Sequence, residues 1–167
     1  MGSNVLVVMG SDSDLDAILP AVDVLKELGV PVEVTVASAH RSPDRVVLLA
    51  RSARDKGFGV VLAAAGGAAH LAGVFAAHTT LPVVAIPIAV GTLGGVDALL
   101  SSVQMPGGVP IASVGIGSGR NAGLFAAAIL SSSDAALAGR LDTLRTRQAA
   151  KVVDADAKVQ AKLSSRT

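Results

Sequence analysis

The chain has 167 residues, of which 51% are hydrophobic and 2% are aromatic, and its formal net charge at pH 7 is +1. This length predicts one domain, and so high a hydrophobic fraction excludes a disordered chain. The near-neutral charge and the absence of Trp and Tyr give no reason to expect nucleic acid or an anionic membrane as a partner. The absence of Cys excludes disulfides, thiolate nucleophiles and Cys-based metal sites, and it fits a cytoplasmic enzyme.

The first residues, MGSNVLVVMG, carry a short apolar run at 5–9 without a basic segment before it, so no signal peptide is expected. Apolar stretches elsewhere stop well short of the roughly 18 residues needed to span a bilayer. The many Ala, Val and Leu side chains are therefore expected to be buried, either in a core or between subunits. A small chain has limited interior for them, which favours a homo-oligomer.

Short apolar runs alternate with longer amphipathic segments along the chain. Strands are predicted at 4–9, 32–37, 60–64, 83–86 and 111–115, and helices at 12–28, 43–56, 68–78, 96–103 and 121–130. A last amphipathic helix is expected to begin near Ser133, because Leu137, Leu141 and Leu144 recur at helical spacing. In the helix at 43–56, Ser42 is expected at the N-cap and Pro43 in the first turn.

This alternation of apolar strands and helices is typical of a parallel sheet covered on both faces. Five strands predict an α/β fold with three layers, α/β/α, in which a doubly wound, flavodoxin-like sheet is followed by a C-terminal helix. No second composition regime or long linker occurs, so residues 1–167 are predicted to form a single catalytic domain. The Lys- and Ser-rich tail at 154–167 is expected either to fray or to pack on a neighbouring subunit.

Ligands of open α/β sheets bind beyond the carboxyl ends of the strands, where loops enter helices. The loop after the first strand is GSDSD, residues 10–14. One interpretation is that Ser11 or Asp12 caps the next helix. The other is that the loop forms a nest of hydroxyl and amide groups for a phosphate, with an Asp that binds ribose hydroxyls.

The loop after the second strand is SAHRSP, residues 38–43. Helix capping explains Ser42 and Pro43 but not His40 and Arg41. Arg suits bidentate recognition of phosphate, and His is the side chain whose protonation changes near neutral pH. The alternative to a catalytic loop is a solvated turn.

After the third strand comes AAAGGAAHLAG, residues 63–73. Gly66 and Gly67 allow the backbone to approach a ligand closely. His70 is either a core histidine or a second histidine at the same edge of the sheet. The three histidines, His40, His70 and His78, show no metal-ligand spacing, and no Walker loop is present. Proton transfer on a substrate held by its phosphate, in a cavity that excludes water, is the chemistry that remains.

Four segments of the chain resemble the catalytic subunit of phosphoribosylaminoimidazole carboxylase, of the bacterial type that acts as N5-carboxyaminoimidazole ribonucleotide mutase in purine biosynthesis. They are GSDSD, SAHRSP, GGAAHLAG and VDALLSSVQMPGGVP, in the family's order. The resemblance extends from Val5 to about Leu130. It implies a flavodoxin-like subunit, an octameric assembly, a ribonucleotide substrate and a reaction without metal or other cofactor.

The resemblance also implies roles for individual residues. Ser11, Asp14, Ser38 and Arg41 are expected to bind the ribose phosphate, and His40 to act as the catalytic acid and base. Gly66, Gly67, His70 and Leu71 are expected to line the pocket for the base and the carboxylate.

Some positions depart from the family pattern. Ala72 replaces the usual Pro, Ala64 stands where Gly is common, and GIGSGRN (115–121) is shorter than the family's segment. Two alternatives to the mutase stay open. One is a direct carboxylase that uses free carbon dioxide, and the other is a non-enzymatic binding or signalling module. The Asp of a phosphoacceptor and the aromatic residues of a flavin carrier are both missing from the expected loops.

Overall fold

A computed structural model describes residues 2–166. The strands of this part of the chain are β1 (Asn4–Met9), β2 (Val32–Val36), β3 (Phe58–Gly66), β4 (Val83–Ile88) and β5 (Ala112–Ser113). They form one parallel sheet in the order β2-β1-β3-β4-β5. The helices are η1 (Asp12–Asp14, a 3-10 turn), α1 (Leu15–Glu27), α2 (Pro43–Ser52), α3 (Leu71–His78), α4 (Val96–Val103), α5 (Gly119–Ser131) and α6 (Ala135–Ser164). The prediction of a doubly wound, flavodoxin-like α/β fold is confirmed.

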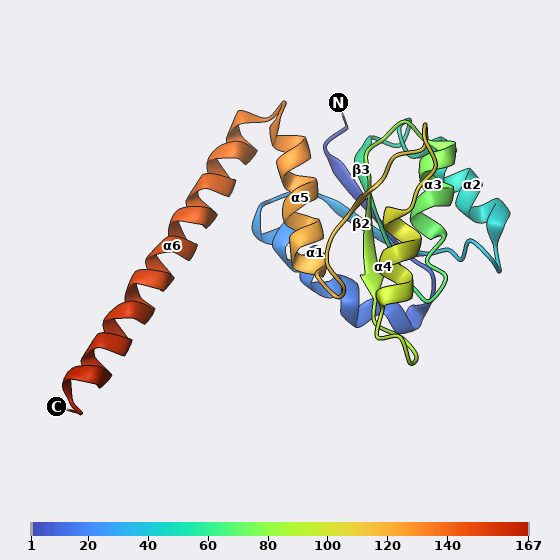
Figure 1. The fold of residues 1–167 in the computed structure, drawn as a ribbon. Helices are drawn as coiled ribbons and strands as arrows, with labels where there is room; N and C mark the ends of the chain where they lie inside the picture. Colours follow the sequence, from blue (N-terminus) through green and yellow to red (C-terminus); the bar gives the residue numbers. More distant parts are fainter. Residues whose placement is uncertain (1, 167) are drawn as a thin grey trace.

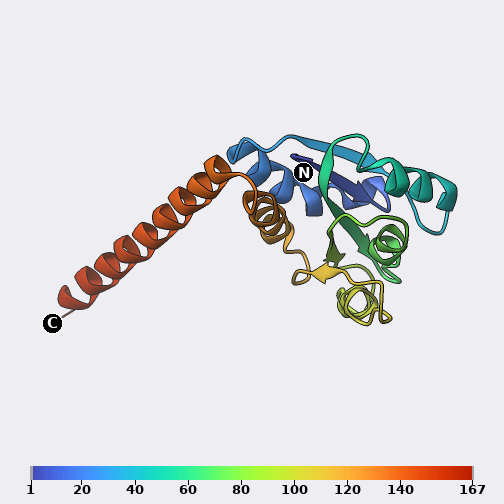
Figure 2. The same cartoon turned by 90° about the horizontal axis from the view of Figure 1, so that it is seen from above.

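Helices cover both faces of the sheet (Figures 1 and 2). Successive side chains of a strand point to opposite faces. Val5 and Val7 of β1 therefore pack against α1 and α5 in one apolar cluster. Leu6 and Val8 pack against α2 and α3 in the other. Both faces of β1 are buried, which explains why this strand reads as a continuous apolar run.

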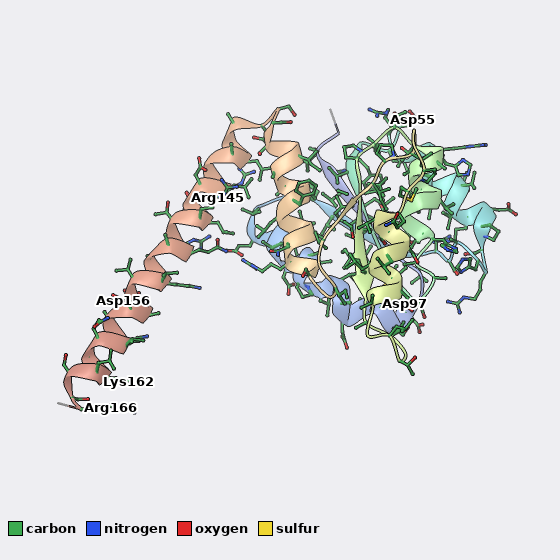
Figure 3. The ribbon with its side chains drawn as sticks, viewed as in Figure 1. Asp55, Asp97, Arg145, Asp156, Lys162 and Arg166 are labelled. Carbon is green, nitrogen blue, oxygen red and sulfur yellow. The ribbon has the colours of Figure 1, made fainter. Side chains whose placement is uncertain are left out.

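The C-terminal helix α6 belongs only partly to this core. Leu137, Leu141 and Leu144 are buried beside α5, as their spacing predicts, whereas residues 145–164 are all exposed. Figures 1 and 2 show this second half of α6 extending away from the body, and Figure 3 shows Arg145 and Lys162 along it. Residues 154–164, for which fraying or packing on a neighbouring subunit is expected, belong to this helix.

Several element boundaries differ from the predicted ones. The strand expected at 60–64 continues to Gly66, which pairs with Ile88 of β4. The helix expected at 68–78 begins only at Leu71, after Gly67 turns the chain with a φ of +62°. The helix expected at 43–56 ends at Ser52, and β5 is reduced to Ala112–Ser113. Because α3 begins at Leu71, His70 lies at its N-cap and not in its first turn.

Candidate active site

The loops after β1, β2 and β3 meet at the carboxyl edge of the sheet. Strand β1 lies between β2 and β3. The connection after β1 therefore leads to one side of this strand, and the connection after β2 leads to its other side. Such a switch point leaves a crevice where ligands of doubly wound folds bind. Here it holds a cavity of ≈ 340 Å³.

Eight of the nine predicted site residues line this cavity. They are Ser11, Asp14, Ser38, His40, Arg41, Gly66, His70 and Leu71. Gly67 is the exception, because it is not part of the lining and a Cβ placed on it would meet nothing within 4 Å. The role of Gly67 is therefore to turn the chain between β3 and α3.

The GSDSD loop is held by a reciprocal cap at the start of η1. The Ser11 backbone N–H donates to Asp14 Oδ2 at 3.0 Å, and the Ser13 N–H donates to Ser11 Oγ at 3.4 Å. The capping interpretation is thus correct for Ser11. Burial raises the pKa of the Asp14 carboxyl above its usual value, and hydrogen bonds from Ser11 and the nearby Arg41 guanidinium only partly offset this effect.

Hydrogen bonds among its own residues stabilise the SAHRSP loop. Ser42 occupies the N-cap of α2 and Pro43 begins the helix, both as expected, but the Ser42 hydroxyl makes no capping hydrogen bond to the helix. It accepts the Ser38 N–H at 3.0 Å and donates to the Ser38 carbonyl at 3.2 Å. The Ser38 hydroxyl in turn accepts the Arg41 N–H at 3.2 Å. These local bonds compete with capping and close the loop on itself.

Arg41 connects the loops that follow β1 and β2. Its Nη2 donates to the Gly10 carbonyl oxygen at 3.0 Å, and its Nε lies 3.4 Å from Ser38 Oγ. The ion pairs found within residues 2–166 involve Arg120 and Arg147, not Arg41. The exposed Arg41 guanidinium is therefore positioned by neutral acceptors and keeps its charge for an anionic ligand.

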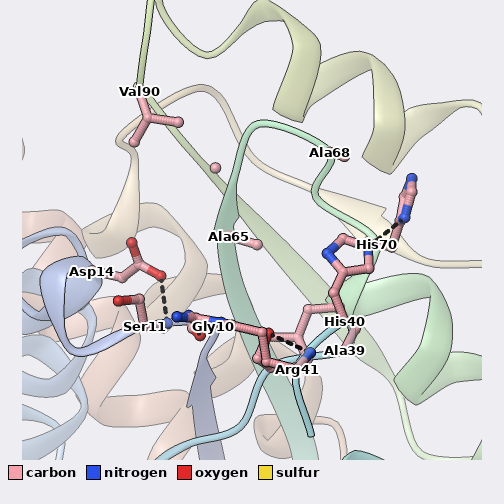
Figure 4. A pocket seen from close by; sticks show the side chains of 13 residues that line it. Gly10, Ser11, Asp14, Ala39, His40, Arg41, Ala65, Ala68, His70 and Val90 are labelled. Atoms are coloured by element: carbon pink, nitrogen blue, oxygen red, sulfur yellow. Dashed lines mark hydrogen bonds between the residues drawn. The ribbon is translucent and has the colours of Figure 1, made fainter. Parts of the chain in front are cut away.

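His40 and His70 face each other across the cavity rim. The Nε2 of His40 lies 2.9 Å from the Nδ1 of His70, and the two rings meet edge to face. One nitrogen must donate and the other accept, so the contact orients both rings. Figure 4 shows the second ring nitrogen of His40 turned toward the interior of the cavity. The expectation that both histidines gather at one edge of the sheet is confirmed.

A second part of the cavity wall is apolar. It consists of small or aliphatic side chains from β3, from the start of α3 and from the loops after β2, β3 and β4: Ala39, Ala65, Ala68, Leu71 and Val90. Except for Leu71, the sequence interpretation did not assign these residues to the site, and it also missed Gly10. The AAAGGAAHLAG run was a usable signal for Ala65 and Ala68. Val90 could be found only from the sheet order, which places the loop after β4 beside the loop after β3.

Among residues 2–166, no group of three or more His, Cys, Asp or Glu side chains is arranged to hold a metal ion. None of the helices in the same range combines the length and apolar character that crossing a membrane requires.

Comparison with known proteins places the chain in a family. The family model described as AIR carboxylase matches residues 4–151. The chain belongs to the AIR carboxylase family. Three curated relatives bear the name N5-carboxyaminoimidazole ribonucleotide mutase. The Aquifex aeolicus protein is 53% identical over 81% of this chain and 81% of its own length. The Bacillus subtilis protein is 52% identical over 83% and 87%, and the Synechocystis protein is 46% identical over 92% and 88%.

Solved structures agree with the observed architecture. The crystal structure of Treponema denticola PurE superposes with a TM-score of 0.85 at 27% sequence identity, covering 92% of this chain and 96% of that one. The flavodoxin-like arrangement is therefore shared with family members whose sequences have diverged widely.

Proposed function

We propose that this protein is an N5-carboxyaminoimidazole ribonucleotide mutase. The reaction moves a carboxyl group from the exocyclic nitrogen to carbon 4 of the aminoimidazole ring, a step of purine biosynthesis. The observation that carries the proposal is the cavity in which an unpaired guanidinium, a pair of histidines and an apolar wall converge. The names of the curated relatives support the same activity.

The polar end of the cavity suits the ribose phosphate. Among the described residues Arg41 forms no ion pair, and the Ser11 and Ser38 hydroxyls lie in the same cavity. Charge-assisted hydrogen bonds of this kind hold a phosphate firmly. The Asp14 carboxyl, held by the Ser11 N–H, is assigned to the ribose hydroxyls.

His40 is assigned the proton transfers. In the substrate, the carboxyl group is bonded to the exocyclic nitrogen as a carbamate. Cleavage of this N–C bond releases carbon dioxide and leaves the electron pair on the aminoimidazole, whose carbon 4 then bonds to the carbon dioxide. Carbon 4 gives its proton to His40, and His40 supplies a proton to the exocyclic nitrogen. The atoms and electrons balance as an isomerisation, and no cofactor is required.

The remaining predicted residues are assigned to the base. Gly66, His70 and Leu71 line the cavity, and they are assigned to the side that faces the ring. A small, mainly apolar pocket slows the competing reaction of carbon dioxide with water, because it leaves little room for water beside the ring.

A direct comparison of two substrates tests the activity. Purified protein is given either the N5-carboxylated ribonucleotide or aminoimidazole ribonucleotide with bicarbonate, without ATP, and the 4-carboxylated product is measured. The proposal expects rapid product formation from the N5-carboxylated compound. Product formed only from aminoimidazole ribonucleotide and bicarbonate would identify a direct carboxylase and refute the mutase.

We extend the proposal to the assembly. The chain is assigned as one catalytic unit that forms a cytoplasmic homo-oligomer, an octamer by resemblance to the family. Exposed apolar side chains support association: Val96, Leu100 and Val103 recur on one face of α4, and Val152 and Val159 lie on the second half of α6. Packing of α6 on a neighbouring subunit is part of this assignment. Light scattering after gel filtration tests it, and a monomer at micromolar concentration would refute it.

A further inference from the structure

The loop between β4 and α4, residues 89–95, contributes Val90 to the lining of the active-site cavity. Residues 89–94 are exposed, and Gly91, Gly94 and Gly95 have φ values of +63°, +58° and +90°. A Cβ on Gly95 would lie 2.7 Å from Ile116 Cγ2 and 3.0 Å from the Ala89 Cα. The end of the loop is therefore packed against its beginning, which fixes the direction in which the intervening Val90 points.

Val90 lies directly above Gly66. A Cβ placed on Gly66 would come 2.5 Å from Val90 Cγ2 and 3.0 Å from Cγ1. The space that an alanine would occupy at position 66 is thus already filled by the two Val90 methyl groups. Figure 4 shows Val90 reaching from its loop toward the cavity, away from Arg41. Val90 therefore closes the apolar end of a cavity whose other end is polar.

This placement has a chemical consequence under the function proposed above. The reaction releases carbon dioxide, a small apolar molecule that contains no charge for Arg41 or His40 to hold. Only the shape of the apolar wall can keep it beside carbon 4 until the new bond forms. We propose that Val90 is a specificity-determining residue that retains carbon dioxide in the cavity and so favours its transfer over its escape. The inference rests on the proposed function.

Isotope retention tests this role. The N5-carboxylated substrate carries ¹³C in its carboxyl group, and the buffer contains excess unlabelled bicarbonate with carbonic anhydrase to trap any carbon dioxide that escapes. The ¹³C content of the 4-carboxylated product and the amount of decarboxylated ribonucleotide are then measured by mass spectrometry. The wild-type protein is expected to retain the label. Val90→Ala, which removes both methyl groups, is expected to raise escape roughly tenfold, as for other losses of apolar pocket contacts.

Two further variants separate retention from general damage. Leu93→Ala changes a more exposed side chain of the same loop that does not line the cavity, and it is expected to retain the label like the wild type. Val90→Thr keeps the branched shape and is expected to retain more label than Val90→Ala, even if the alanine variant is unstable. Label retention in Val90→Ala and Val90→Thr equal to that of the wild type overturns the inference, as does equal escape in Leu93→Ala. Absence of any turnover by the wild type refutes the proposed function instead.

Discussion

His40 and His70 form a hydrogen-bonded pair in which Nε2 of His40 lies 2.9 Å from Nδ1 of His70. The first residue follows β2 and the second follows β3, so the fold joins two loops that are 30 residues apart in sequence. The pair leaves one nitrogen of His40 facing the cavity (Figure 4). We therefore expect His40 to contribute more to turnover than His70, which can be tested by replacing each in turn.

Replacing His40 with Asn is expected to abolish turnover while substrate binding persists. Asn preserves a polar side chain of moderate size but cannot exchange a proton near neutral pH. Removal of a positioned acid and base lowers turnover by ~10²- to 10⁴-fold. Turnover is measured with the N5-carboxylated substrate, and binding by calorimetry. His78→Asn is the matched control, because His78 lies in a separate pocket with Arg51 and Arg54. Near-normal turnover in His40→Asn would remove His40 from the mechanism.

A smaller effect is expected for His70. If its role is to orient the His40 ring, His70→Ala loses one hydrogen bond, worth about 1 kcal/mol, and turnover falls by less than about tenfold. His70→Asn places an amide oxygen near the position of Nδ1 and is expected to recover much of that loss. The readout is kcat and KM for both variants. A fall in kcat as large as that of His40→Asn, without recovery by Asn, would contradict an orienting role.

Arg41→Ala is expected to weaken substrate binding more than it slows the chemical step. The guanidinium is assigned to the phosphate, and loss of a charge-assisted contact costs about 2–4 kcal/mol. KM and the dissociation constant should therefore rise together while kcat changes less. The control is Arg45→Ala, since Arg45 bonds to Thr35 and to the Val36 carbonyl outside the cavity. An unchanged dissociation constant in Arg41→Ala would show that phosphate binds elsewhere.

Asp14→Asn is expected to stabilise the fold near neutral pH and, at the same time, to weaken substrate binding. Burial raises the pKa of Asp14 above its usual value of 3.8, so the folded state holds this proton more tightly than the unfolded state. The Asp14 contribution to the free energy of unfolding therefore falls as the pH rises from below 3.8 through the raised pKa, and it stays low at neutral pH. Asn does not ionise and can still accept the Ser11 N–H.

Denaturant unfolding at several pH values checks this sign. Relative to the wild type, Asp14→Asn should gain stability as the pH rises from below 3.8 to neutrality. KM should rise if the carboxylate binds the ribose hydroxyls. Asp12→Asn is the control, since Asp12 is an exposed neighbour in the same 3-10 turn and does not line the main cavity. A stability difference that shrinks with rising pH would contradict the role given to burial.

The sequence was sufficient to predict the sheet and most of the site because both depend on local patterns. Apolar runs of strand length predict β1 and β4, and the residues after β1, β2 and β3 gather wherever a parallel sheet is doubly wound. His40, Arg41 and Asp14 were found in this way. The choice between alternative hydrogen bonds within one loop was beyond such patterns. Ser42 occupies the N-cap as predicted, but only the structure reveals that its hydroxyl binds the Ser38 backbone and not an N–H group of α2.

Contacts between distant segments were also beyond local patterns. Val90 has no chemical signature, and its proximity to Gly66 follows from the pairing of β3 with β4. The continuation of α6 to Ser164 was missed in part because residues 145–164 are all exposed, so no buried face marks this half of the helix among residues 2–166. Tertiary context, not propensity, decides such cases.

Close packing of α1 against α5 gives the last prediction, which concerns stability alone. A Cβ on Gly123 of α5 would lie 2.5 Å from Val24 Cγ1 and 2.8 Å from the Ala21 carbonyl oxygen of α1. Gly123→Ala is therefore expected to force the two helices apart and to lower the free energy of unfolding by about 1–3 kcal/mol. The matched control is Gly139→Ala at an exposed position in the first half of α6, where a Cβ meets nothing within 4 Å.

The control is expected to have the opposite sign. Alanine is the better helix former by roughly 0.5–1 kcal/mol at an unstrained position. Urea unfolding of both variants, followed by circular dichroism, measures the two changes at the same protein concentration, so that subunit association affects both alike. Equal stabilisation by the two alanines would mean that α1 and α5 can separate without cost, and the tight crossing at Gly123 would then not contribute to the stability of the fold.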